Sequence, residues 1–190
     1  MKYLIAGFIL MFTYVNLTGM EFSEETWISQ EENFSFRLPF DDYNYVIVEE
    51  AYNQESFYEV CISLNRASRT ADFIRIPSVT FKVEPIDIIS YENYFSYAAE
   101  ALNYYYDCEL IDSGTTDING IKTVWITAEL KPGEPFNPDY ILKFKQYYLL
   151  EPNPTNPVPR AFFISYLSTT QEYDYYLSYF EEIVKSFRLI

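Results

Sequence analysis

Cysteine is the most reactive side-chain type in this chain, which has 190 residues, two cysteines (Cys61 and Cys108) and no histidine. The lack of histidine excludes Cys-His and Ser-His-Asp catalytic sites, and it excludes zinc or haem sites built on histidine. The two cysteines do not form the Cys-x-x-Cys pattern of redox and zinc sites. They are therefore either the two halves of one disulfide, as expected in an oxidising compartment, or two buried thiols.

Oxygen ligands are concentrated where Asp112, Asp117 and the amide of Asn119 lie within one short segment. The segment is loosely similar to a calcium-binding loop. However, calcium takes about six to eight oxygen ligands, and the EF-hand spacing and its final glutamate are missing. The dipeptide Asn119-Gly120 is instead typical of a type I′ hairpin turn that follows a strand. We therefore predict a hairpin here, and neither a bound metal ion nor a cofactor.

Three pairs of adjacent acids offer a further chemistry, general acid and base catalysis by two carboxylates. They are residues 41–42, 49–50 and 181–182. Neighbouring side chains on a strand point to opposite faces, and residues 181–182 fall outside the apolar stripe of a predicted helix. We therefore expect solvated acids rather than the paired carboxylates of a glycosidase, and we predict no catalytic residue.

Tyrosine is unusually frequent, with 20 residues in the chain. Helical periodicity places Tyr97 and Tyr104 opposite the apolar face of one predicted helix, and it places Tyr175 opposite that of another. Rows of rigid, exposed aromatic rings suit the recognition of proteins or glycans. These three tyrosines are therefore the predicted interaction surface. The alternative is that the rings are simply tolerated at the surface.

The formal net charge of the chain is −15. Such a charge repels the phosphates of nucleic acids and the headgroups of anionic membranes, so neither is an expected partner. The same field attracts basic proteins and divalent cations. The expected partner is a protein, or another ligand outside the cytoplasm.

The N-terminus has the pattern of a secretory signal peptide. Lys2 precedes an almost wholly apolar run over residues 3–15, and the small residues Thr18 and Gly19 follow. The apolar run is shorter than the about 20 residues that a membrane-spanning helix requires. We therefore predict cleavage of residues 1–19, a secreted or periplasmic location, and no membrane span in the mature chain. A buried N-terminal helix or strand is the alternative.

The mature chain is expected to form one domain over residues 33–190, after an acidic lead-in over residues 20–32. Apolar alternation predicts strands over residues 33–38 and 57–64, and β-type runs predict strands over residues 45–48, 73–83, 121–130, 140–150 and 160–167. Apolar spacings of three and four predict helices over residues 90–105 and 172–187, and proline-rich loops occupy residues 131–139 and 151–159. The order indicates an antiparallel meander closed by a helix. Asn33 begins a sequon that would be glycosylated only in a eukaryotic secretory route.

Four features occur in a recognisable order. They are a strand ending in Leu38-Pro39, a helix rich in tyrosine and alanine, an Asn119-Gly120 turn before a strand that carries Trp125, and a final helix ending in Ser186-Phe187-Arg188. This order resembles the PsbP-like fold family, which includes an extrinsic photosystem protein, a nuclear Ran-binding relative and many exported bacterial proteins of unknown role. The resemblance brings no catalytic residue with it. The chain departs from the family pattern at Asp42-Tyr43, where many members have a tryptophan, and in the length of the loop over residues 151–159.

The resemblance implies an α+β fold, with a central antiparallel sheet of about six strands covered by helices on both faces, as in an αβα sandwich. The sequence as a whole predicts an exported binding protein without catalytic activity. The alternative is an enzyme of low catalytic demand that uses carboxylates and tyrosines on extracellular glycans.

Overall fold

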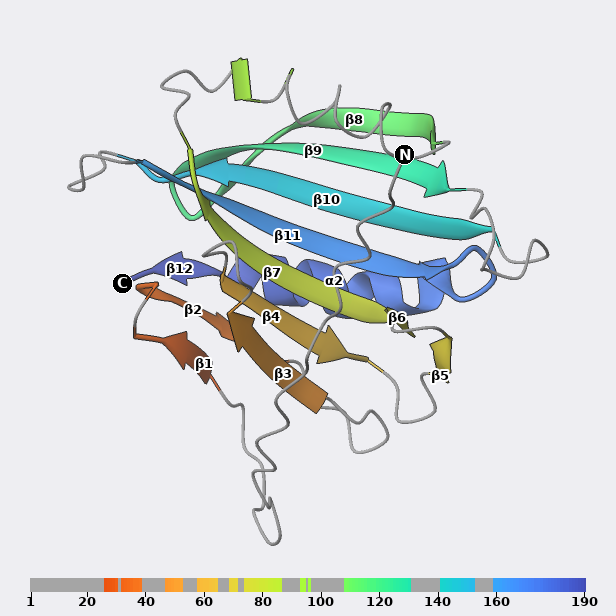
Figure 1. Ribbon diagram of the computed structural model, residues 1–190. Helices are drawn as coiled ribbons and strands as arrows, with labels where there is room; N and C mark the ends of the chain where they lie inside the picture. The colour runs from red at the N-terminus through yellow and green to blue at the C-terminus, as the bar shows by residue number, and fades with distance from the viewer. Residues whose placement is uncertain are drawn as a thin grey trace, which may run out of the picture.

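The largest element of the fold is an antiparallel sheet of seven strands (Figure 1). The computed structural model describes residues 26–30, 32–38, 47–52, 58–64, 69–71, 74–86, 93–94, 96, 108–130, 141–152 and 159–190. In spatial order the sheet contains β3 (Ile47–Tyr52), β4 (Tyr58–Ser63), β7 (Ser78–Pro85), β11 (Arg160–Thr169), β10 (Leu142–Leu150), β9 (Ile121–Leu130) and β8 (Cys108–Ile118). The predicted meander is confirmed, because β9, β10 and β11 are consecutive both in the sequence and in the sheet.

Two smaller sheets complete the strand content of the described residues. One has the order β1 (Thr26–Ser29), β2 (Phe34–Arg37) and β12 (Arg188–Leu189), and the other pairs β5 (Arg69–Ala71) with β6 (Ile74–Ile76). Strand β1 lies within the segment that the sequence indicates as an acidic lead-in. The Trp27 ring of β1 packs against Phe36 of β2, with ring centroids 6.5 Å apart, so this part of the lead-in belongs to the folded domain.

Helix α2 (Tyr173–Ser186) confirms the predicted terminal helix almost residue for residue. Its apolar stripe is buried and consists of Tyr173, Tyr176, Phe180, Ile183 and Val184. Thr169 and Glu172 have the spacing of a capping box, but the box is not formed: the Thr169 hydroxyl lies 3.3 Å from the Glu172 carboxylate, and Glu172 is itself the N-cap without a side-chain cap bond. The helix begins one turn later than a Thr169 cap would place it, so tertiary packing rather than capping fixes its start.

The main core lies between one face of the large sheet, helix α2 and the small sheet β1-β2-β12 (Figure 1). At its centre the ring of Phe36 stacks on Phe81 of β7, with centroids 4.1 Å apart and planes 6° apart. Phe187, directly after α2, packs on Phe81 at 6.2 Å and on Phe162 at 5.7 Å. Aromatic rings from both sheets and from the helix end therefore interlock in one cluster, which is expected to contribute strongly to stability.

The opposite face of the large sheet carries a second, smaller core. Tyr94 is 2% exposed and packs edge-on against Tyr148 of β10, at 6.4 Å between centroids, and against Phe163 of β11 at 5.8 Å. The helix predicted over residues 90–105, which carries Tyr94, lies largely outside the described residues.

The expected αβα sandwich with about six strands is wrong in two respects. The large sheet has seven strands, and α2 is the one helix whose full length lies within the described residues, although Asn93, Tyr94 and Ser96 are also helical. Helix α2 shares its face of the sheet with the small sheet β1-β2-β12. Part of the covering layer is therefore β-structure rather than helix. Strand β8 is the strand expected before the Asn119-Gly120 turn, but its length could not be read from the sequence, because a strand exposed on both faces has no apolar alternation. Strand β12 was missed because its two residues directly follow the helix.

The predicted hairpin at Asn119-Gly120 is confirmed. Both residues have positive φ, 53° and 86°, as a type I′ turn requires, and β8 and β9 pair up to Ile118 and Ile121 on either side of it. The segment that is loosely similar to a calcium loop is therefore mostly strand. Among the described residues no group of three or more acids, cysteines or histidines is placed to hold a metal ion. In the same part of the chain, no helix is long and apolar enough to cross a membrane.

Candidate functional site

The outward face of helix α2 carries an aromatic and acidic stripe. Tyr175 is 63% exposed, and its ring meets Tyr176 edge-on, with centroids 4.8 Å apart and planes 86° apart. Tyr179 lies one turn further along, 6.2 Å from the Tyr175 ring, and is half-buried against the main core. Glu172 and Glu182, both exposed, follow the same side of the helix at spacings of three from Tyr175 and Tyr179. We call these residues, Glu172, Tyr175, Tyr179 and Glu182, the tyrosine stripe.

Both ends of α2 are fixed by contacts with other elements. In the first turn, the buried Tyr166 hydroxyl of β11 donates a hydrogen bond to the Tyr173 carbonyl at 2.9 Å. At the last turn, the Asn119 amide of the β8–β9 hairpin donates to the carbonyls of Lys185 and Phe187 at 2.9 and 2.8 Å. These carbonyls have no partner within a helix, so the hairpin acts as a C-terminal cap. The tyrosine stripe is therefore presented by a rigid helix, which reduces the entropy lost on binding.

One flank of α2 is attached to the sheet by a charged cluster. The Glu181 carboxylate accepts hydrogen bonds from Lys145 Nζ at 2.6 Å and from the Tyr147 hydroxyl at 3.0 Å. Lys145 Nζ also lies 4.7 Å from the centroid of the Trp125 ring, close enough for a cation–π contact. Burial and the neighbouring Glu181 carboxylate raise the pKa of the Tyr147 hydroxyl. Glu181 is thus engaged in holding the helix, and the arrangement does not leave its carboxylate available as a catalytic base.

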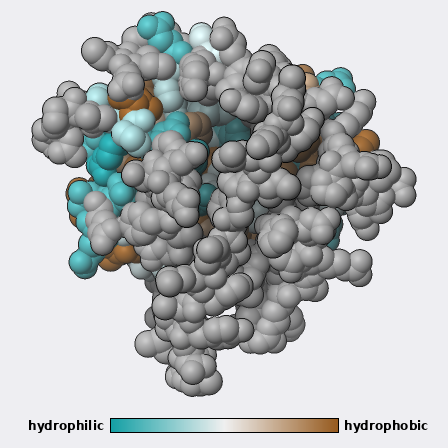
Figure 2. Space-filling view, in the orientation of Figure 1, coloured by the Kyte–Doolittle hydropathy of each residue, from teal (hydrophilic) through white to brown (hydrophobic). Residues whose placement is uncertain are grey.

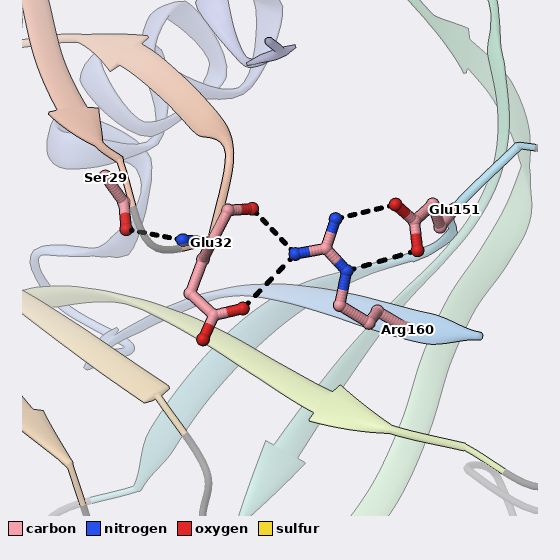
Figure 3. Close-up of polar contacts among 4 residues, drawn as sticks. All are labelled: Ser29, Glu32, Glu151 and Arg160. Atoms are coloured by element: carbon pink, nitrogen blue, oxygen red, sulfur yellow. Dashed lines mark hydrogen bonds and ion pairs between the residues drawn. The ribbon is translucent and has the colours of Figure 1, made fainter. Parts of the chain in front are cut away.

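A second charged cluster joins the β1–β2 turn to the start of β11 (Figure 3). Arg160 binds both carboxylate oxygens of Glu151, through Nε at 3.1 Å and Nη2 at 2.6 Å. Its Nη1 donates to the carbonyl and the carboxylate of Glu32, at 2.9 and 3.3 Å, and the Ser29 hydroxyl accepts from the Glu32 amide at 3.3 Å. Hydrogen bonding to Glu151 raises the pKa of Arg160. Glu32 and Glu151 converge on the same guanidinium, and this pairing engages both carboxylates in joining the two elements.

Of the predicted interaction residues, the structure places Tyr175 on the surface, as expected, within the tyrosine stripe. Tyr97 and Tyr104 lie outside the described residues. Asn33, the sequon residue, is exposed in the β1–β2 turn with a φ of 53°.

The structure does not bring Cys61 and Cys108 together. They lie on β4 and β8 and form no disulfide, and the strands β7, β11, β10 and β9 lie between them. Neighbouring strands are about 4.8 Å apart, so two strands with four others between them are much farther apart than the about 7 Å within which the Cα atoms of a disulfide lie.

The role of Glu181 was not predicted from the sequence. Residues 181–182 were expected to be two solvated acids, but Glu182 is exposed whereas Glu181 is engaged by Lys145 and Tyr147. The partners are on β10, far from Glu181 in the sequence, so no local pattern carried the signal. Only the position of Glu181 at the border of the apolar stripe distinguished it from its neighbour.

Solved structures share this arrangement of elements at low sequence identity. The cyanobacterial PsbP (CyanoP) from Synechocystis is 11% identical, with a TM-score of 0.56 over 94% of this chain and 98% of that chain. LpqN, involved in cell envelope biogenesis of Mycobacterium tuberculosis, is 11% identical, with a TM-score of 0.62 over 88% of this chain and 90% of its own. The chain has a PsbP-like fold. The Saccharomyces cerevisiae Ran-binding protein Mog1p, 12% identical, matches with a TM-score of 0.50 over 88% of this chain and 95% of its own.

The PsbP-like fold is a scaffold, and at these identities it does not transfer a ligand or a partner. No protein-family model and no curated protein matches the sequence. Any function must therefore be argued from this chain's own surface.

Proposed function

We propose that this protein is an exported, non-catalytic binding protein that uses the tyrosine stripe of α2 to dock a cationic segment of a protein outside the cytoplasm. The observation that supports this best is Tyr175, a large aromatic side chain that is 63% exposed and held at 4.8 Å against Tyr176. Aromatic side chains with few rotatable bonds contribute disproportionately to binding energy at protein interfaces.

The charge around the stripe favours a cationic partner. Glu172, Asp174 and Glu182 are all exposed on or beside it. Lysine and arginine side chains are attracted to the faces of tyrosine rings and to carboxylates. The net charge of −15 adds a long-range attraction that accelerates the association of a basic partner.

The proposal of export rests on the N-terminal pattern of Lys2 and the apolar run over residues 3–15. The absence of catalysis is supported by the chain's lack of histidine. It is also supported by Glu181, Glu32 and Glu151, three half-buried carboxylates that are all engaged with basic side chains.

Site-specific photo-crosslinking in the native host tests the docking surface. A photoreactive phenylalanine analogue at position 175 is expected to give a crosslink to one recurrent protein, because the partner would cover this ring. The matched control is the same analogue at Lys185, which is exposed on the same helix but lies ten residues, about 15 Å along the helix axis, from Tyr175.

Adding salt should reduce crosslinking from position 175, since part of the attraction is electrostatic. Equal crosslinking from positions 175 and 185, or a partner with no basic segment, would contradict the proposed surface.

A further inference from the structure

Strand β8 forms one edge of the large sheet and is its longest strand (Figure 1). It pairs with β9, and in the part of the chain that the structure describes no other strand pairs with it. Residues 109–113 and 115–117 of β8 are exposed. An edge strand presents a row of backbone donors and acceptors that can pair with a further strand.

The hairpin geometry determines which backbone groups point outward. In a two-residue type I′ hairpin, the residues that flank the turn, here Ile118 and Ile121, exchange hydrogen bonds with each other, and the bonded pairs then alternate along the ladder. The N–H and C=O groups of Asp117, Thr115 and Ser113 therefore point away from β9. The Ser113 N–H is bonded to its neighbour's carboxylate, Asp112 Oδ1, at 2.8 Å. Thr115 and Asp117 thus present the open part of the edge.

The side chains of β8 favour one kind of added strand. The strand carries Glu109, Asp112 and Asp117, and it has no lysine, arginine or proline. A second copy of β8 would bring these acids close to one another, and like charges across strands are destabilising. An added strand with basic side chains would be attracted instead.

The beginning of β8 offers apolar contacts beside these acids. Leu110 is 60% exposed and Ile111 is 48% exposed, and the register with β9 shifts between Leu110 and Asp112, which marks Ile111 as a β-bulge. Exposed aliphatic side chains beside acids suit a segment with both charged and apolar side chains. In the view of Figure 2, the visible described residues form small hydrophilic and hydrophobic patches.

We propose that the outer edge of β8 binds an extended, basic segment of a partner protein as an eighth strand of the sheet. Main-chain hydrogen bonds to Thr115 and Asp117 would give affinity, while the acids select a basic sequence and Leu110 and Ile111 anchor one end. This surface is separate from the tyrosine stripe and does not depend on it.

Amide NMR of the ¹⁵N-labelled protein, titrated with synthetic peptides, tests the proposal. The peptides have about eight residues, which is a usual strand length. The probe alternates lysine with threonine, and the control peptide alternates glutamate with threonine. We expect the basic peptide to slow hydrogen exchange of the Thr115 and Asp117 amides, and the acidic peptide to have no such effect. Protection by both peptides, or shifts confined to α2, would overturn the proposal.

Two variants separate pairing at the edge from general attraction. Asp112→Asn should weaken binding of the basic peptide by about threefold, whereas Gln30→Lys, the same change in net charge in the exposed β1–β2 turn, should leave the affinity unchanged. Thr115→Pro removes an outward N–H without changing charge and should abolish protection at Asp117. Equal weakening by Asp112→Asn and Gln30→Lys would show that only net charge matters. Protection of the β8 amides that appears without peptide and is lost on dilution would show that a second copy occupies the edge. Either result would overturn the proposal.

Discussion

Replacing Glu181 by alanine tests whether the charged cluster holds α2 on the sheet. The change leaves Lys145, whose side chain is 16% exposed, without its carboxylate at 2.6 Å, and it removes the acceptor of the Tyr147 hydroxyl. Hydrogen bonds to charged groups contribute about 1.5–3 kcal/mol each. Because a quarter of the Glu181 side chain is exposed, solvent screening reduces their combined effect. We expect the free energy of unfolding to fall by about 2 kcal/mol, in the range typical of a broken polar network.

The measurement is a urea titration followed by tryptophan fluorescence, because Trp125 lies beside Lys145. The matched control is Glu182→Ala at the adjacent, exposed position, which should change the free energy of unfolding by less than about 0.5 kcal/mol. A double-mutant cycle with Lys145→Met should give a coupling of about 1 kcal/mol, since the two side chains are in contact. Equal, small effects of Glu181→Ala and Glu182→Ala would refute the argument that the cluster anchors the helix.

Three further predictions follow from the core, the sheet and the N-terminus. Phe180 is fully buried and its ring lies 5.3 Å from that of Tyr166, so Phe180→Ala should lower the free energy of unfolding by about 3–5 kcal/mol in a denaturant titration. Burial, opposed by Lys82, raises the pKa of Glu59 above its usual value of 4.5, so folding favours the protonated acid. Stability should therefore decline as the pH rises through the folded-state pKa, and Glu59→Gln should remove this decline in urea titrations across the pH range. N-terminal sequencing of protein from its native host should find a mature chain that begins within residues 19–22, and an intact Met1 on the exported protein would contradict cleavage.

The elements that were predictable from the sequence are those with a strong local pattern. Helix α2 was predicted within one residue at each end, because its apolar residues recur at spacings of three and four. The Asn119-Gly120 turn was predicted because these residue types tolerate the positive φ of a type I′ turn. The strands on either side of the proline-rich loops were predicted from their apolar runs, and the loops between them because proline lacks the N–H group that strand pairing needs.

The candidate site was only partly predictable, because only some of its features depend on a local sequence pattern. The exposure of Tyr175 followed from helical phase and is what the structure has. The difference between Glu181 and Glu182 did not, because it depends on Lys145 and Tyr147 of another element. A polar strand such as β8, exposed on both faces, has no apolar pattern by which to recognise it.

The sequence by itself determined the order of the main elements, the buried face of α2, the acidity of the chain and the lack of histidine chemistry. These depend on residue type and on periodicity within one segment. Only the tertiary structure decided that β1 and β12 join β2 in a second sheet over the core, that the β8–β9 hairpin caps α2, and which carboxylates are neutralised by basic partners. Such contacts join residues far apart in the chain, and they form because burial brings their elements together, so no local pattern encodes them.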